Sequence, residues 1–234
     1  MDIILHPSRE RGRTRLSWLD SRHSFSFGHY YEPRRMGFGA LRVINEDIVA
    51  PGAGFPPHSH ANMEIVSIML AGALAHRDSL GSSDTIQAGD VQRMCAGSGI
   101  EHSEYNASQT EPVHFLQIWI VPQRQDRTPG YAQRHFPLEQ RDNRWCLVVS
   151  PDGRDDSLSI DQQAHIHLTR LDAGKTLEHA LEPGQRAWLQ LTRGRARLNG
   201  HPLAAGDGAA VCGSGVLLLE ADSPVEACLF QLQA

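Results

Sequence analysis

The stretch Gly52-Ala-Gly-Phe-Pro-Pro-His58-Ser-His60-Ala-Asn-Met-Glu64 carries two potential metal ligands one residue apart, His58 and His60. A later stretch, Gly97-Ser-Gly-Ile-Glu-His102-Ser-Glu104-Tyr-Asn106, repeats the arrangement with His102 and Glu104. Side chains at positions i and i+2 of a β-strand point to the same face. Each pair should therefore aim at one point, and three imidazoles with a carboxylate suit a first-row transition metal. The sequence predicts a metal site built from two strands.

Histidine is common in this chain, so one His-x-His pair means little by itself. With 13 His among 234 residues, about 0.7 such pairs are expected by chance. A second pair, His165 and His167, has no glutamate four residues on and no glycines before it. We interpret that pair as part of an ordinary strand with half-exposed histidines. The first pair differs because Gly52, Glu64 and a second Gly-rich motif accompany it at set spacings.

Length and composition favour two domains made of short strands. The chain of 234 residues can form two domains of about 110 residues each. It has 21 Gly and 13 Pro but only 6% aromatic residues, which suits strands joined by turns better than long helices. The formal net charge of −5 argues against a nucleic-acid partner, which would favour a basic face.

Nothing in the chain indicates a membrane segment or secretion. No run reaches the roughly 18 apolar residues that span a bilayer, and the N-terminus does not resemble a signal peptide. The cysteines lie far apart without Cys-x-x-Cys spacing, at positions 95, 146, 212 and 228. We therefore expect a cytoplasmic protein with reduced thiols, rather than a disulfide framework or a zinc ribbon. A monomer without a membrane partner is expected.

Short strand-like runs separated by turns follow one another along the chain, which is typical of an antiparallel sandwich or barrel. Near the N-terminus, the alternation of Phe25 and Phe27 predicts a further strand. His23 and His29 are interpreted as part of a packing surface, because nothing places them near the two motifs. The polar residues 122–144 are predicted to connect two halves.

The second half of the chain echoes the first. Ala205-Gly-Asp repeats Ala88-Gly-Asp, and Cys212-Gly-Ser-Gly repeats Cys95-Ala-Gly-Ser-Gly. An internal duplication of one β unit explains these echoes. We therefore predict an all-β protein with an N-terminal metal-binding barrel over residues 1–121 and a C-terminal barrel over residues 145–234, both antiparallel.

The duplication does not extend to the ligands. Aligning the glycines of the two halves places other residues at the four ligand positions: Ala180, Glu182, Leu218 and Glu220. Because no imidazole remains there, the C-terminal barrel is expected to lack metal ligands. Nearby His179 is the one residue that could change this expectation.

The two motifs resemble those of the cupin superfamily, in Gly52-x5-His58-x-His60-x3-Glu64 and in Gly89 through Gly97, His102 and Asn106. Ala96-Gly-Ser-Gly-Ile-Glu-His-Ser-Glu is similar to the pirin family, as are Trp18-Leu-Asp-Ser and Met36-Gly-Phe-Gly-Ala-Leu-Arg-Val-Ile-Asn. The bacterial branch described as quercetin 2,3-dioxygenase-like is the best match. The resemblance covers nearly the whole chain, most strongly residues 11–121, although Cys95 replaces the proline expected in the second motif. It implies a bicupin of two jelly-roll barrels, with metal in the N-terminal barrel only.

The resemblance to pirins implies that His58, His60, His102 and Glu104 are the metal ligands. General cupins often use the glutamate of the first motif instead, which is Glu64 here. Strand parity does not decide between the two, because six residues separate Glu64 from His58 and a regular strand would turn both to one face. We favour Glu104 as the ligand, with Glu64 either supporting the site or standing in solvent on its strand.

The expected ligand set leaves two of six octahedral positions open, unlike a closed tetrahedral zinc site. It suits Fe(II), and also Ni, Cu, Mn, Co or Zn. The resemblance implies a dioxygenase that cleaves flavonols such as quercetin with dioxygen and releases carbon monoxide. Glu104 is then the candidate catalytic base. Four apolar side chains near the motifs are candidates to line the entrance for a flat aromatic substrate: Phe55, Met63, Ile65 and Met94.

Two other functions fit the same residues. A non-enzymatic, redox-sensing regulatory protein of the pirin type would bind a protein partner differently as Fe(II) and Fe(III), and would turn nothing over. A cupin-type isomerase would convert its substrate without consuming oxygen. The dioxygenase ranks first among the three, although a fold and a metal site do not fix the substrate.

Overall fold

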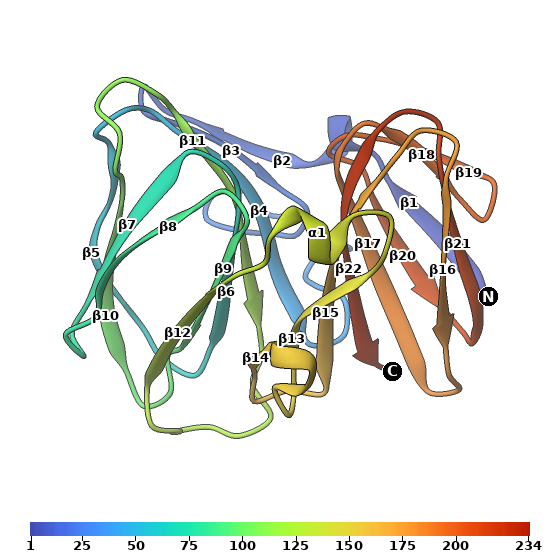
Figure 1. Ribbon diagram of the computed structural model, residues 1–234. Helices are drawn as coiled ribbons and strands as arrows, with labels where there is room; N and C mark the ends of the chain where they lie inside the picture. Colours follow the sequence, from blue (N-terminus) through green and yellow to red (C-terminus); the bar gives the residue numbers. More distant parts are fainter. The chain divides into compact units, whose positions relative to one another are not determined.

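The computed structural model describes residues 1–234 and is almost entirely β, as the sequence predicts, with twenty-two strands (Figure 1). Helix is confined to three segments of one turn: η1 (Ser8–Glu10), α1 (Leu138–Arg141) and η2 (Arg154–Asp156). None of these helices is long and apolar enough to cross a membrane.

The chain forms two compact units. We call residues 12–135 with 160–162 the N-terminal unit. The C-terminal unit comprises residues 1–11, 136–159 and 163–234. The predicted boundaries at residues 121 and 145 therefore miss two pieces of chain, which are the N-terminal strand and part of the supposed connecting segment.

Both pieces cover sheet edges. β1 (Asp2–His6) pairs with β20 (Gly208–Cys212), so the first strand of the chain, blue in Figure 1, belongs to the C-terminal unit. β12 (Gly130–His135) pairs in the same way with β9 (Asp90–Cys95) of the N-terminal unit. An uncovered edge strand presents unpaired backbone groups to other chains, so each unit gains a protective outer strand.

The N-terminal unit consists of two sheets. A seven-stranded sheet has the order β12-β9-β6-β11-β4-β3-β2, and a four-stranded sheet has the order β5-β10-β7-β8. Leu74 and Ile86 of the smaller sheet share a buried cluster with Val49, Met69 and Phe115 of the larger one, so the sheets face each other across an apolar core. The strands not yet defined are β2 (Gly12–Arg15), β3 (Leu19–His23), β4 (Leu41–Val49), β5 (Gly54–His60), β6 (Glu64–Ala71), β7 (Ala73–Asp78), β8 (Ser83–Gln87), β10 (Ile100–Asn106) and β11 (Val113–Ile120).

The C-terminal unit repeats this plan. Its seven-stranded sheet has the order β1-β20-β17-β22-β15-β13-β14, and its four-stranded sheet has the order β16-β21-β18-β19. Strands β15 to β22 thus take the places of β4 to β11, as the predicted duplication requires. The remaining strands are β13 (Cys146–Ser150), β14 (Leu158–Ser159), β15 (Ala164–Leu171), β16 (Thr176–Leu181), β17 (Gln185–Arg193), β18 (Arg195–Leu198), β19 (His201–Ala204), β21 (Gly215–Ala221) and β22 (Val225–Gln233).

The predicted closed barrels are wrong in one respect. Hydrogen bonding does not run around either unit, because each unit has two separate sheets whose ladders end at edge strands. In the C-terminal unit, Leu189 and Leu229 of the large sheet pack with Leu217 and Leu219 of the small one in a single buried cluster. Apolar packing between the faces closes each unit, where a barrel would use backbone pairing.

The strand predicted from Phe25 and Phe27 does not form. β3 ends at His23, and Phe27 makes only an isolated bridge to Tyr30 across a tight turn. Gly28 lies at the centre of that turn with φ +56°, a left-handed conformation that glycine adopts without a steric cost. The alternation of the two aromatic residues reflects their packing around a loop, since Phe25 is buried.

The register of the two halves differs by one residue from the sequence alignment. Asn106 pairs with Leu74, two residues after Gly72, and Ala221 pairs with Ala196, two residues after Gly194. Counting back from these pairs places leucines at the positions of His102 and Glu104: Leu217 and Leu219, in place of the predicted Leu218 and Glu220. Glu220 turns outward and pairs with Arg197.

The same pairing moves the first motif by one residue. Leu217 lies opposite His179, as His102 lies opposite His58. His179 therefore takes the position of His58, in place of the predicted Ala180. The buried Leu181, two residues further along, takes that of His60 in place of the predicted Glu182. A one-residue shift exchanges the two faces of a strand, so register decides which residues face the core.

Candidate metal centre

Strands β5 and β10 place the two motifs side by side, with His58 directly opposite His102. Along β10 the residues alternate between buried and exposed, with His102 and Glu104 both buried. Along β5, His58 and His60 are half-buried, and Ser59 between them is exposed. Each predicted pair therefore shares one face of its strand, because both segments are regular where the ligands lie.

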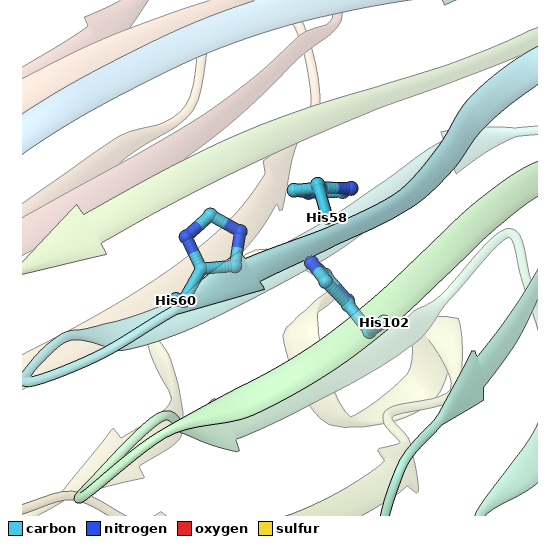
Figure 2. A group of neighbouring side chains, drawn as sticks. All are labelled: His58, His60 and His102. Atoms are coloured by element: carbon cyan, nitrogen blue, oxygen red, sulfur yellow. The ribbon is translucent and has the colours of Figure 1, made fainter.

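Three imidazoles converge at this point (Figure 2). The ring centroids of His58 and His102 are 4.4 Å apart, those of His58 and His60 4.8 Å, and those of His60 and His102 5.0 Å. One nitrogen from each ring lies within 4.8 Å of a nitrogen of the other two. This spacing leaves room for a single ion with an Nε2 or Nδ1 ligand at about 2.1 Å from each ring.

Glu104 stands beside this trio. Its carboxylate forms a second cluster with His102 and His76, again with ligand atoms within 4.8 Å of one another. A register irregularity between His102 and Glu104 shifts the pairing of β10 with β5, so that Glu104 lies opposite Phe55. The extra residue belongs to β5, where Pro56 and Pro57 together face Ser103, whereas β10 pairs regularly with β7 and Glu104 lies opposite His76. Spacing within one strand could not show which residues of β5 and β7 face Glu104.

The atoms at the centre lack hydrogen-bond partners. His102 is 2% exposed, yet neither Nδ1 nor Nε2 has a partner, and the same holds for Oε1 of the buried Glu104. An unpaired buried polar atom costs about 1–3 kcal/mol, so native proteins seldom keep several together without a ligand. Imidazole nitrogens and a carboxylate oxygen with free lone pairs fit a transition-metal ion.

Burial also keeps the imidazoles neutral, which is the form that binds metals. It lowers the pKa of His102 to about 3 and that of His60 to about 4, in both cases with a further contribution from the neighbouring rings. The ring orientation of His58 is fixed by a hydrogen bond to the backbone, because its Nδ1–H donates to the carbonyl of Pro56 at 2.8 Å. A carbonyl only accepts, so Nε2 of His58 keeps its lone pair for a metal.

A chain of hydrogen bonds orients Glu104. Ser67 Oγ–H donates to Gln117 Oε1 at 2.6 Å, so the amide nitrogen of Gln117 points the other way and donates to Glu104 Oε2 at 2.9 Å. Without a metal, burial and the nearby carboxylate of Asp47 raise the pKa of Glu104 to about 8. The carboxyl group is therefore a much stronger base than an exposed glutamate.

His76 was missed by the sequence analysis. Its Nε2–H donates to Asp78 Oδ2 at 3.0 Å, and Gln92 Nε2–H approaches its Nδ1 at 3.5 Å. Its ring lies 4.7 Å from that of Tyr131 and 5.3 Å from that of His102. Both nitrogens are engaged, so His76 packs behind the trio in this state. The spacing of His76 and Asp78, one residue apart on β7, was the available signal.

Glu64 lies outside both clusters. β5 ends at His60 and β6 begins at Glu64, and Asn62 between them has φ +52°. His58 and Glu64 therefore belong to strands of different sheets. The alternation of side chains along a single strand therefore cannot place Glu64 on the same face as His58. Glu64 is buried opposite Cys95, and burial raises its pKa. The structure favours Glu104 over Glu64 as the carboxylate next to the imidazoles.

A cavity of about 100 Å³ opens onto His58, His60 and Glu104. Its apolar wall includes Phe27, Phe55 and Trp119, and Trp119 makes an edge contact with His60 at a ring distance of 5.0 Å. Of the four predicted entrance residues only Phe55 is there; Met63, Ile65 and Met94 belong to a separate apolar cluster. Ile65 and Met94 lie on the same face of the large sheet as Trp119, but they pack against Ile100 of the small sheet instead of lining the cavity. Met63 precedes β6 and lines a groove that adjoins the cavity.

His23 also lines this cavity, which contradicts its assignment to a mere packing surface. Its Nδ1–H donates to Asn45 Oδ1 at 2.8 Å, and its Nε2 accepts from Thr14 Oγ1–H at 2.9 Å. His23 lies on β3, next to β4 in the large sheet, and only that pairing brings it to the cavity. His29 is exposed, and it is absent from the cavity wall.

The chain is similar to known proteins over nearly its whole length. Residues 5–120 match the Pirin family, and residues 147–232 match the family described as quercetinase C-terminal cupin domain. The chain is 42% identical over 230 residues to quercetin 2,3-dioxygenase of Escherichia coli K12, covering 98% of both proteins. It is 39% identical over 213 residues to a pirin-like protein of Caulobacter vibrioides, covering 91% of both.

A crystal structure of the bacterial pirin YhhW from Escherichia coli in complex with nickel(II) superimposes with a TM-score of 0.95 at 41% identity, and each chain is covered to 99%. The fold and the histidine cluster define a cupin-like metal protein with a duplicated β unit. The chain belongs to the pirin family.

Proposed function

We propose that the protein is a metal-dependent dioxygenase that cleaves flavonols such as quercetin and releases carbon monoxide. The observation that carries this proposal is the convergence of half-buried His58 and His60 with buried His102 beside Glu104, at the end of a cavity with aromatic walls. The relative named quercetin 2,3-dioxygenase, which matches over nearly its whole length, supports the same choice of reaction.

We assign His58, His60, His102 and Glu104 as the metal ligands, with iron(II) as the working metal. When bound, the metal supplies a Lewis acid that lowers the proton affinity of a substrate hydroxyl and a centre at which substrate and dioxygen can meet. The nickel(II) complex of the related pirin supports the choice of a divalent first-row ion. The free nitrogens of His102 are the ligand atoms for which the protein offers no other partner.

Glu104 is assigned as the base that takes the proton from the substrate 3-hydroxyl. Its Oε1 has no partner, so this oxygen can either coordinate the metal or, once it has moved off the metal, accept that proton, while Oε2 stays bound to the amide of Gln117. Burial and Asp47 raise the pKa of the metal-free carboxyl group to about 8, and a bound cation would lower it, so its proton affinity is high only while Glu104 is off the metal. Gln117 thus holds the carboxylate of Glu104 in place through Oε2 and leaves Oε1 available.

The cavity accommodates the reacting ring, and an adjoining groove accommodates the rest of the substrate. A cavity of about 100 Å³ is smaller than the sites of about 300–1,000 Å³ that usually hold such ligands. A groove of about 370 Å³ shares Phe27 and Trp119 with it and is lined further by Tyr30 and Met36. A flat two-part aromatic molecule fits this combination, because each part meets an aromatic wall.

The test is to load the metal-free protein with Fe(II) under anaerobic conditions and then add oxygen and quercetin. Carbon monoxide should appear in proportion to the quercetin consumed, and the His102→Ala variant should produce none. His29→Ala is the matched control, because this exposed histidine lies outside the cavity. If the metal binds and no carbon monoxide forms, the dioxygenase assignment is wrong. A protein partner bound differently by the Fe(II) and Fe(III) forms would then support the regulatory alternative.

The cytoplasmic location and the monomeric state stay predictions from the sequence. No disulfide joins the four cysteines in the structure.

A further inference from the structure

A bulge in β4 places an arginine in the wall of the groove that adjoins the metal cavity. Trp119 of β11 pairs with Val43 of β4, and the next residue, Ile120, pairs with Leu41, so Arg42 is an extra residue without a partner in this ladder. An extra residue of this kind lets a strand aim one side chain in a new direction. Arg42 and Val43, which are neighbours in the chain, therefore both line the groove of about 370 Å³.

The guanidinium of Arg42 is held in position but keeps donors for a ligand. Its Nη1 donates to the backbone carbonyls of Ser26 and Met36, two other residues of the groove wall. A guanidinium has five N–H donors, and Nη1 carries two of them, so three remain on Nη2 and Nε. No acidic side chain lines the groove, so the charge of Arg42 is not neutralised there.

Residues 24–40, which supply most of the groove wall, contain a single acid, Glu32, and this acid already has a partner. Its Oε1 accepts from Nε and from the backbone N–H of Arg34, both at 3.2 Å. These bonds, with a smaller contribution from Arg35, hold the pKa of Glu32 below its usual value. Glu32 lies outside the groove wall and is engaged by Arg34, so it does not compete with a ligand for Arg42.

A second unpaired donor lies where the groove meets the metal cavity. Trp119 lines both, and its buried Nε1–H has no hydrogen-bond partner. Its ring is held by edge contacts with His60 and Phe27, at ring distances of 5.0 and 5.4 Å. Buried donors seldom lack a partner in native proteins, so this N–H fits an acceptor atom on a ligand. The groove and its junction with the cavity thus offer donors and a positive charge.

We propose that the groove binds a negatively charged oxyanion group of the aromatic substrate through Arg42. This inference rests on the proposed function and narrows its substrate class to anionic flavonols. The ring with the 3-hydroxyl occupies the metal cavity, and the second ring carries the anion into the groove. The remaining N–H donors of a guanidinium form a fork that matches two oxygens of an oxyanion. The aromatic walls contact the ring, and Arg42 selects its charge.

The test compares quercetin with quercetin 5′-sulfonate, which carries an oxyanion on its second ring and keeps the 3-hydroxyl free. Dissociation constants are measured by isothermal titration calorimetry on nickel(II)-loaded protein without oxygen, so that binding is observed without turnover. The sulfonate should bind about tenfold more tightly than quercetin at low salt. This preference should shrink in about 0.5 M salt, because ions screen the attraction between partly exposed charges.

Substitutions of Arg42 show whether this residue causes the preference. Arg42→Met should make the two dissociation constants equal, and Arg42→Lys should restore part of the difference, because it keeps the charge and loses the fork. Since Arg42 also holds the loop, Arg42→Met can weaken both compounds, and only the ratio of their dissociation constants reports on the charge. Arg77→Met is the matched control: it removes an exposed arginine of β7 outside the groove and should leave the ratio at about ten.

Equal affinities for the two compounds in the wild type, or a preference that survives in Arg42→Met, would overturn the proposal. The dioxygenase assignment fails in a different way, when neither compound yields carbon monoxide although the sulfonate binds through Arg42. If neither compound binds to the loaded protein, both proposals are wrong.

Discussion

Replacing His102 by leucine should make the metal-free protein more stable while removing its metal site. The ring is 2% exposed and neither nitrogen has a hydrogen-bond partner, so the wild-type side chain carries the cost of an unsatisfied buried polar group, about 1–3 kcal/mol. Leucine has no polar atom and gains about 1 kcal/mol from its apolar surface. Leu217 occupies the equivalent position in the C-terminal unit and packs in its apolar core. The expected gain in free energy of unfolding is about 2–4 kcal/mol.

Differential scanning calorimetry with excess chelator measures this gain. For a chain of this size 1 kcal/mol moves Tm by about 2–4 °C, so His102→Leu should melt about 4–16 °C above the metal-free wild type. Isothermal titration with nickel(II) should show binding to the wild type and none to the variant. His114→Leu is the control, because this histidine lies on β11 with 29% of its side chain exposed and pairs with Glu46 outside the cluster. If metal-free His102→Leu melts at a lower temperature than the metal-free wild type, the unpaired imidazole of His102 does not destabilise the metal-free protein, and this reasoning is wrong.

Three further outcomes are expected. Gln117→Leu removes the hydrogen-bond donor to Glu104, and a hydrogen bond to a charged group contributes about 1.5–3 kcal/mol. The affinity for nickel(II), measured by competition titration, should therefore fall about 10- to 100-fold. An unchanged affinity would show that Glu104 is not a metal ligand. Phe27→Ala removes the wall shared by cavity and groove, so KM for quercetin should rise about tenfold with kcat nearly unchanged, whereas a fall in kcat alone would contradict the placement of the substrate. Burial and the nearby Glu64 raise the pKa of Cys95 to about 11, so its thiolate fraction at pH 8 is about one in a thousand. Iodoacetamide should alkylate the exposed Cys212 first. The alkylation rate of Cys95, followed by mass spectrometry, should rise about tenfold per pH unit toward pH 11. Equal alkylation rates for the two cysteines at pH 8 would contradict this prediction.

The sequence by itself determined the parts of the site that depend on local strand geometry. His58 with His60, and His102 with Glu104, share a face because alternate residues of any regular strand do so. The repeated Gly-containing turns were enough to predict an all-β chain with a duplicated unit, since such turns have strong local preferences. The family resemblance rested on the same short motifs and was confirmed.

Tertiary structure decided whatever depends on pairing between distant strands. The pairing of β10 with β7 sets Glu104 opposite His76, and a bulge in β5 sets it opposite Phe55. A one-residue shift in the second half brings Leu217 and His179 to the positions of His102 and His58. Spacing within one strand carries no information about its register against another, because register is fixed by the packing of whole sheets. For the same reason the pairing of His167 with His179, twelve residues and one sheet apart, appears only in the folded chain.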